Sequence, residues 1–123
     1  MTVQTQVAAK SLSSPDETRT FANGRLDVAT VDGNAVGRAT FEPGWRWSES
    51  VRPLVGGDSC QYHHTGYVIS GSLHVRMDDG AEADLNSSDV YHIPPGHDAW
   101  VNGDEPCVMV DWEPTGADYA RPT

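Results

Sequence analysis

Three side chains that bind metals or move protons lie close together in the sequence, at Cys60, His63 and His64. Thiolate and imidazole both suit Zn, Cu and Fe, and imidazole also exchanges a proton near neutral pH. The sequence continues as TGYVISG, a run rich in β-branched and aromatic residues that ends in glycine and is typical of a strand. Because neighbouring side chains on a strand point to opposite faces, only one of the two histidines can face the protein interior.

We predict that His64 faces inward and that His63 faces outward. His64 has the same parity as Cys60, which places both donors on one face and within reach of one ion. Gly66 shares this parity and leaves room for an imidazole ring. The alternatives are a one-residue slip, because Tyr67 on the other face is also apolar, and a buried neutral histidine that only forms a structural hydrogen bond.

A second candidate follows the rigid turn IPPG, at His97 and Asp98. A histidine there can supply a second nitrogen ligand, or act as a general acid or base that the neighbouring carboxylate orients. It can equally cap and fix the loop. Cys60 can likewise be only a small buried thiol, which is the role we expect of Cys107 in the apolar run PCVMVDW.

Aromatic side chains could form the walls of a substrate pocket around these groups. Trp45 and Trp47 are two residues apart and share a face, Trp100 follows the IPPG turn, and Tyr62 has the parity of the inward histidine. Such rings can stack on a planar ligand. Alternatively, the tryptophans pack in a core or in a dimer interface.

The elements that must position these residues are short strands, because no helical period follows the first 24 residues. Short runs are separated by Gly, Pro, Asn and Asp at close spacing, which favours an all-β sandwich or barrel. The run SLHVRM alternates and turns His74 outward, and the following MDDG predicts a tight hairpin with Gly80 at positive φ. In DVYHI we expect His92 to face outward, because this choice buries the more apolar Tyr91 and Ile93.

Length and charge limit the class of protein. A chain of 123 residues suits one domain; we expect a flexible N-terminal arm at residues 1–13 and a single domain at 14–123, with one short helix capped by Ser14. The net charge of −10 disfavours nucleic acid and anionic membranes as partners. The N-terminus has no apolar run of the secretory type, so we expect a cytoplasmic protein. Two cysteines do not make a disulfide framework.

Two segments, HTGYVISGSLHVRMDDG and SSDVYHIPPGHDAW, resemble the two motifs of the cupin superfamily, of the small single-domain type. The resemblance extends over about residues 35 to 112. It implies an all-β fold, an antiparallel jelly-roll β-barrel of cupin type, with at most one short N-terminal helix. It also implies a homodimer and a pocket for a small-molecule ligand inside the barrel.

The resemblance further implies a divalent transition metal, since many cupins hold Fe, Mn, Ni, Cu or Zn through three histidines and a glutamate. Here the glutamate slot falls on His64, two histidine slots fall on Asp58 and Cys60, and the third falls on Ala99. Of these positions His64 and Cys60 are candidate ligands, and His97, which follows the IPPG turn and occupies none of the slots, is the third. Such a site would serve an isomerase, cyclase or oxygenase; the alternatives are a metal-free binding or sensor module and a structural dimer with a vestigial pocket.

Overall fold

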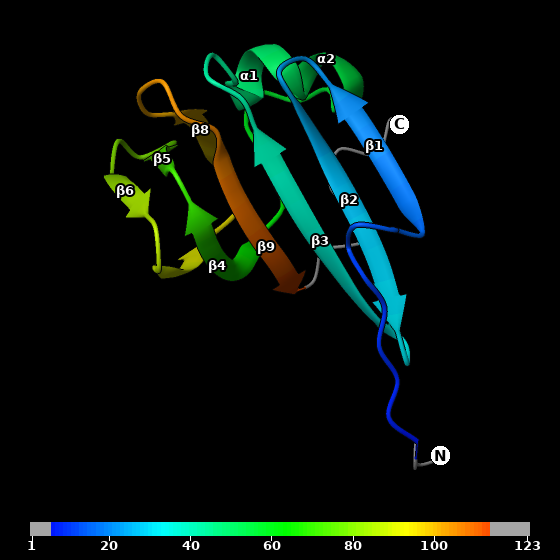
Figure 1. Ribbon diagram of the computed structural model, residues 1–123. Helices are drawn as coiled ribbons and strands as arrows, with labels where there is room; N and C mark the ends of the chain where they lie inside the picture. Colours follow the sequence, from blue (N-terminus) through cyan, green and yellow to red (C-terminus); the bar gives the residue numbers. More distant parts are fainter. Residues whose placement is uncertain (1–5, 114–123) are drawn as a thin grey trace.

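The computed structural model describes residues 6–113, which form nine strands and two short helices (Figure 1). The strands are β1 (Glu17–Phe21), β2 (Gly24–Val31), β3 (Asn34–Phe41), β4 (His64–Ser70), β5 (Ser72–Met77), β6 (Glu82–Asn86), β7 (Val90–Ile93), β8 (His97–Val101) and β9 (Cys107–Glu113). The helices are α1 (Trp47–Ser50) and α2 (Arg52–Val55). The prediction of an all-β fold is confirmed.

The strands form two antiparallel sheets. The larger sheet has the order β1-β2-β3-β9-β4-β7, and the smaller sheet has the order β6-β5-β8. The last strand, β9, lies between β3 and β4, so the larger sheet is assembled from segments far apart in the sequence (Figure 1). Both sheets turn one face toward a shared core, which is the arrangement of a jelly roll.

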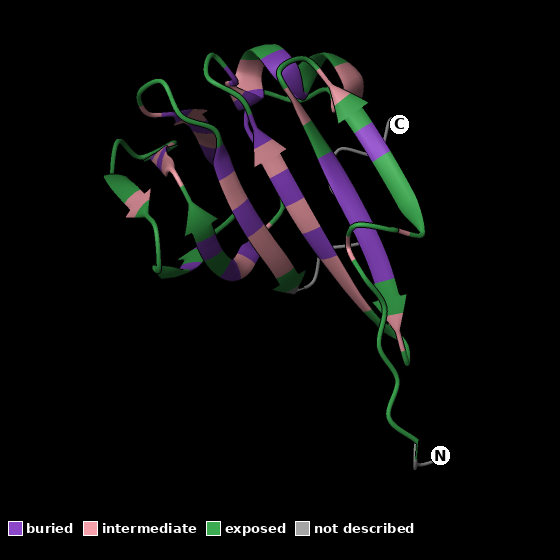
Figure 2. Cartoon of the chain, viewed as in Figure 1, coloured by how far each residue is buried: buried purple, intermediate pink, exposed green. Residues whose placement is uncertain are grey.

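The core follows the alternation of the strands. Buried and less buried residues alternate along β3, β8 and β9, as the bands of Figure 2 show. On β5, Leu73 and Val75 are buried while His74 is turned outward, and Gly80 in the following turn has a φ of 93°. On β7, Tyr91 and Ile93 are buried while His92 is exposed. The orientations predicted for these strands are confirmed.

The short helix predicted at Ser14 is wrong. The segment before β1 forms a turn, and the structure places its two short helices between β3 and β4 instead. The cause is the pairing of Asp16 with β2: its N–H donates to the carbonyl of Val28, and its carboxylate accepts from the N–H of Thr30. These tertiary hydrogen bonds outweigh the local capping signal.

The predicted N-terminal arm lies only partly within the described residues, since residues 1–5 are outside them. Residues 6–13 form no helix or strand, although Lys10 forms an ion pair with Asp16 and Leu12 accepts a hydrogen bond from Arg38. The end of the predicted domain, residues 114–123, is also outside the described part. Within residues 6–113, no helix is long and apolar enough to span a membrane.

Candidate metal centre and its cavity

The structure gives different orientations to the two adjacent histidines. His64 is the first residue of β4 and is buried in the core, whereas His63 is half-buried and its ring lies beside that of His92, with centroids 6.0 Å apart. The register is the one predicted, with Gly66 and Val68 buried on the same face as His64. The one-residue slip is therefore excluded.

Cys60 and His97 are brought together by their own backbones. The N–H of Cys60 donates to the carbonyl of His97 at 2.8 Å, and the N–H of His97 donates back to the carbonyl of Cys60 at 3.2 Å. This isolated antiparallel bridge holds the segment before β4 against the start of β8. Since both side chains are buried, a thiol and an imidazole from distant parts of the sequence meet inside the barrel.

The three predicted ligands converge on one point. Cys60 Sγ lies 3.7 Å from His64 Nε2, the rings of His64 and His97 lie 5.3 Å apart between centroids, and one donor atom from each of the three residues lies within 4.8 Å of the others. A tetrahedral zinc ion sets its ligand atoms about 3.5 Å apart. The residues present therefore fit a metal ion with small side-chain adjustments.

The orientation of His97 supports its role as a ligand. Its Nδ1–H donates to the carbonyl of Pro94 at 2.7 Å, so Nε2 is the ring nitrogen available for coordination. Three protein ligands would leave room for a further ligand on a bound ion, as in catalytic zinc sites. Ala99, on the family's histidine slot, lines the same cavity and supplies no donor there.

Two polar residues of the site, Asp111 and Tyr91, were not among the residues predicted from the sequence. Asp111 Oδ2 accepts a hydrogen bond from His64 Nδ1 at 2.9 Å, and Asp111 Oδ1 accepts one from the Tyr91 hydroxyl. The signal for Asp111 was its parity, which it shares with the buried Cys107 and Met109 on β9. A carboxylate on the inward face of an apolar strand is costly unless it has a partner, and so marks a site.

The two cysteines differ in the pKa of their thiols. Burial disfavours the thiolate of Cys60, but hydrogen bonds from His64 and His97 outweigh this cost and lower its pKa to about 6. Burial also disfavours the imidazolium of His64, but hydrogen bonds to Asp111 and Cys60 raise its pKa to about 9. Burial raises the pKa of Cys107 to about 11. Cys60 is therefore ready to bind a metal at neutral pH, whereas Cys107 is a core residue, as predicted.

The two histidines of the cluster, His64 and His97, line a largely apolar cavity between the sheets, whereas Cys60 is not among its lining residues. The cavity has a volume of about 30 Å³, which is more than one water molecule needs. Trp45 and Trp47 line it, as predicted, and the buried Nε1–H of Trp45 has no hydrogen-bond partner among the described residues. The other lining residues are Ala39, Phe41, His64, Leu73, Tyr91, Ile93, His97, Ala99, Met109 and Asp111.

Two aromatic residues expected in the pocket are not among the lining residues. Trp100 alternates with the buried His97 and Ala99 on β8, so its ring lies on the outer face, against Arg46 at 4.5 Å from its centroid. Tyr62 precedes β4, outside its regular alternation, and is exposed. The inward orientation predicted for Tyr62 was wrong because it assumed strand alternation in a segment that is not a strand.

Asp98 does not orient His97, contrary to expectation. As the next residue on β8 it faces the other way, where its carboxylate accepts hydrogen bonds from Arg46 Nε and from the backbone N–H and hydroxyl of Ser48. It thereby ties α1 to β8, while the carbonyl of Pro94 orients the histidine. The carboxylate that lies beside a histidine of the site is Asp111.

No family model and no curated protein matches the sequence. Solved structures do match. A sugar phosphate isomerase of the cupin superfamily from Silicibacter pomeroyi is 18% identical with a TM-score of 0.59, covering 85% of this chain and 73% of that one. A Klebsiella pneumoniae protein with a double-stranded β-helix domain is 20% identical with a TM-score of 0.57, covering 90% and 87%. A cupin-like protein from Thermotoga maritima is 20% identical with a TM-score of 0.51, covering 74% and 68%.

These similarities and the sheet order agree with the two motifs seen in the sequence. At such identities they establish the architecture and leave the reaction to be argued from the site. The chain has the cupin-type fold, a double-stranded β-helix.

Proposed function

We propose that the protein binds a divalent transition metal through Cys60, His64 and His97, and that the open coordination position receives a group of a small-molecule ligand. The convergence of three buried donor atoms within 4.8 Å carries this proposal. Mixed sulfur and nitrogen ligands suit Zn, Fe, Cu and Ni better than Mg or Ca. The neighbouring sugar phosphate isomerase supports a small-molecule role by analogy of fold.

A bound metal would supply Lewis acidity to a carbonyl or enolate oxygen of the ligand. The chain itself contributes three further functions. Its apolar walls exclude water, which strengthens electrostatic interactions inside the cavity. The Nε1–H of Trp45 is a buried donor that a ligand oxygen can satisfy. The thiolate of Cys60 would hold the ion and lower its net charge.

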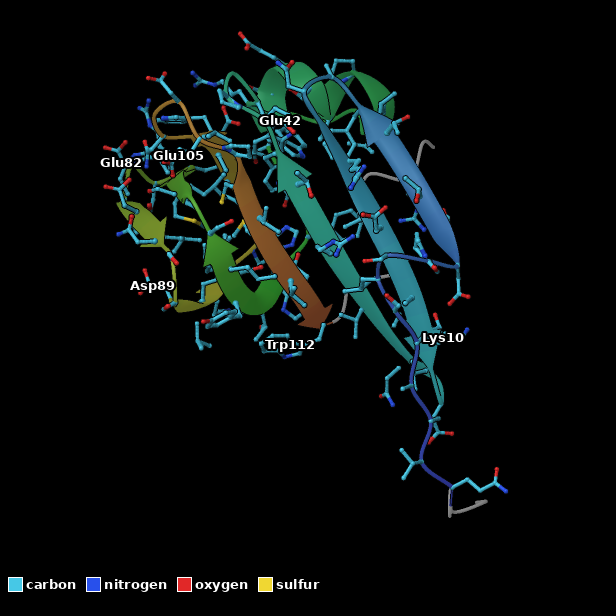
Figure 3. The ribbon with its side chains drawn as sticks, viewed as in Figure 1. Lys10, Glu42, Glu82, Asp89, Glu105 and Trp112 are labelled. Carbon is cyan, nitrogen blue, oxygen red and sulfur yellow. The ribbon has the colours of Figure 1, made fainter. Side chains whose placement is uncertain are left out.

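The acidic surface supports a small molecule as the partner, in preference to nucleic acid or an anionic membrane. The net charge is −10, and Glu82, Asp89 and Glu105 are all exposed and project from the part of the molecule that holds the smaller sheet (Figure 3). Such a surface repels phosphate backbones and anionic lipids.

Metal analysis tests the proposal directly. Protein purified without a histidine tag should hold about one equivalent of Zn, Fe, Cu, Ni or Mn. Cys60→Ala should remove most of it because the thiolate is lost, whereas Cys107→Ala, which changes the other buried thiol, should keep it. Metal below about a tenth of an equivalent in the wild type, after addition of each ion, would exclude the metal site and leave a metal-free binding module as the function.

A homodimer is a further prediction. Exposed apolar side chains gather on the outer face of β9, β4 and β7, the neighbouring strands at one edge of the larger sheet: Tyr67, Ile69, Val90 and Trp112. Val90 is 71% exposed on the edge strand itself, and Trp112 lies near the end of β9 (Figure 3). Exposed apolar groups of this kind mark interfaces, and a two-fold pair would cover them.

Sedimentation velocity at micromolar concentration should therefore give a dimer. Val90→Arg should convert it to a monomer, because a charge would be buried without a partner. Thr20→Arg, on the exposed face of β1 at the opposite edge of the sheet, should leave the dimer intact. A wild-type monomer would contradict the prediction.

A further inference from the structure

We propose that Tyr91 and Asp111 are positioning residues that fix the ring of His64 for metal binding, and that they meet across Gly66, which has no side chain to block their contact. The inference rests on the proposed metal site and deepens it: it names the residues that set the geometry of one ligand. None of the three residues needs to touch the ion. The cupin pattern assigns no ligand slot to Tyr91, Gly66 or Asp111.

The three residues form one row across the larger sheet. Gly66 on β4 pairs with Tyr91 on β7 and with Asp111 on β9, so it lies directly between them. Adjacent strands are about 4.8 Å apart, which puts the backbones of Tyr91 and Asp111 roughly 10 Å from each other. Only a long side chain that lies flat across β4 can connect the two, and the Tyr91 hydroxyl does reach Asp111 Oδ1.

A side chain at residue 66 would block this path. The nearest atom to a Cβ on Gly66 would be the backbone carbonyl oxygen of Val110, so the close approach of β9 already requires glycine here, and the Tyr91 hydroxyl oxygen and Asp111 Oδ1 would follow at 2.5 Å and 2.9 Å. Gly66 has no positive φ, so a special backbone conformation does not explain the glycine. Its role is the close approach of neighbouring groups.

The result is a carboxylate with both oxygens engaged. Oδ1 accepts from Tyr91, and Oδ2 accepts from His64 Nδ1 at 2.9 Å. The tyrosine therefore limits rotation of the carboxylate, and the carboxylate holds the proton of His64 on Nδ1. His64 Nε2 is then directed at Cys60 Sγ, 3.7 Å away, where the proposed ion would lie. A hydrogen bond from a ligating histidine to a carboxylate orients the ring and strengthens it as a donor.

The chain contains a matched control for this arrangement. His74 and Asp84 form the same kind of contact, from Nδ1 to a carboxylate oxygen at 2.7 Å, but on the outer face of the smaller sheet and outside the cavity. Tyr67 is a second control, since it is a tyrosine of β4 that faces outward. Changes at these positions alter the same chemical groups without affecting the proposed centre.

The experiment measures Co²⁺ affinity and the visible spectrum of the Co²⁺ complex in Tyr91→Phe and Asp111→Asn. We expect each variant to bind Co²⁺ about 10–100-fold more weakly than the wild type, with a changed spectrum. Asp84→Asn and Tyr67→Phe should match the wild type. Wild-type affinity and spectrum in Tyr91→Phe and Asp111→Asn, both folded by circular dichroism, would overturn the inference while leaving the metal site intact.

A second readout needs no metal. In metal-free protein with ¹⁵N-labelled histidine, the Nδ1–H proton of His64 should exchange slowly in the wild type and faster in Asp111→Asn and Tyr91→Phe, because the hydrogen bond that protects it is lost or loosened. Unchanged exchange in both variants would overturn the positioning role. A wild-type protein that shows the protected proton but binds no Co²⁺ would overturn the proposed function alone.

Discussion

The His64→Ala variant is expected to lose its bound metal, with a larger fall in affinity than any other single histidine change. His64 supplies one of the three donors that the described residues bring together, and it is also the link between Cys60 and Asp111. Its removal deletes a metal–ligand bond and leaves the Asp111 carboxylate half-buried without the imidazole. The loss should therefore exceed the roughly 10–100-fold typical when only an orienting residue is removed.

His63→Ala is the matched control for this prediction. It removes the same side chain from the adjacent position, where the ring lies beside His92 and outside the cavity. Metal content and affinity should stay within about twofold of the wild type, the scatter expected when a changed residue and the site share no partners. Titration of both variants with Co²⁺ checks the pair. Equal losses from the two variants would contradict the site described here.

Strand alternation correctly predicted the orientation of most candidate side chains that lie on regular strands. It gave the inward orientation of His64, the outward orientation of His74 and His92, and the core position of Cys107, because each lies in a run whose apolar residues fix the face. The same reasoning failed for Tyr62, which lies before β4 begins. Alternation is a property of the strand and does not extend past its end.

The contacts that complete the site could not be predicted from local patterns. Asp111 is 47 residues from His64, and the two meet only because β9 inserts between β3 and β4. Asp98 was chosen to orient His97 because it is adjacent in sequence, but adjacency on a strand puts the two side chains on opposite faces. The pairing of β9 with β4, which are far apart in the sequence, brings Asp111 to His64.

The affinity for metal is expected to rise with pH, by about tenfold per unit between pH 6 and 9. Ligands must release their protons to coordinate. The thiol of Cys60, with a pKa of about 6, is already ionised over this range. The imidazole of His64, with a pKa of about 9, still carries a proton that the metal must displace. One proton is therefore released per ion, and each unit of pH favours binding by one factor of ten.

The two pKa values also define the ends of this range. Above pH 9, His64 is neutral before the metal binds, so the affinity should become nearly constant. Below pH 6, the Cys60 thiolate is protonated as well, so more than one proton must leave and the affinity should fall more steeply than tenfold per unit. Calorimetric titration with Co²⁺ in buffers of different ionisation enthalpy would count the protons: about one at pH 7.5 and a larger number at pH 5. An affinity that does not change between pH 6 and 9 would show that His64 does not surrender a proton to the metal.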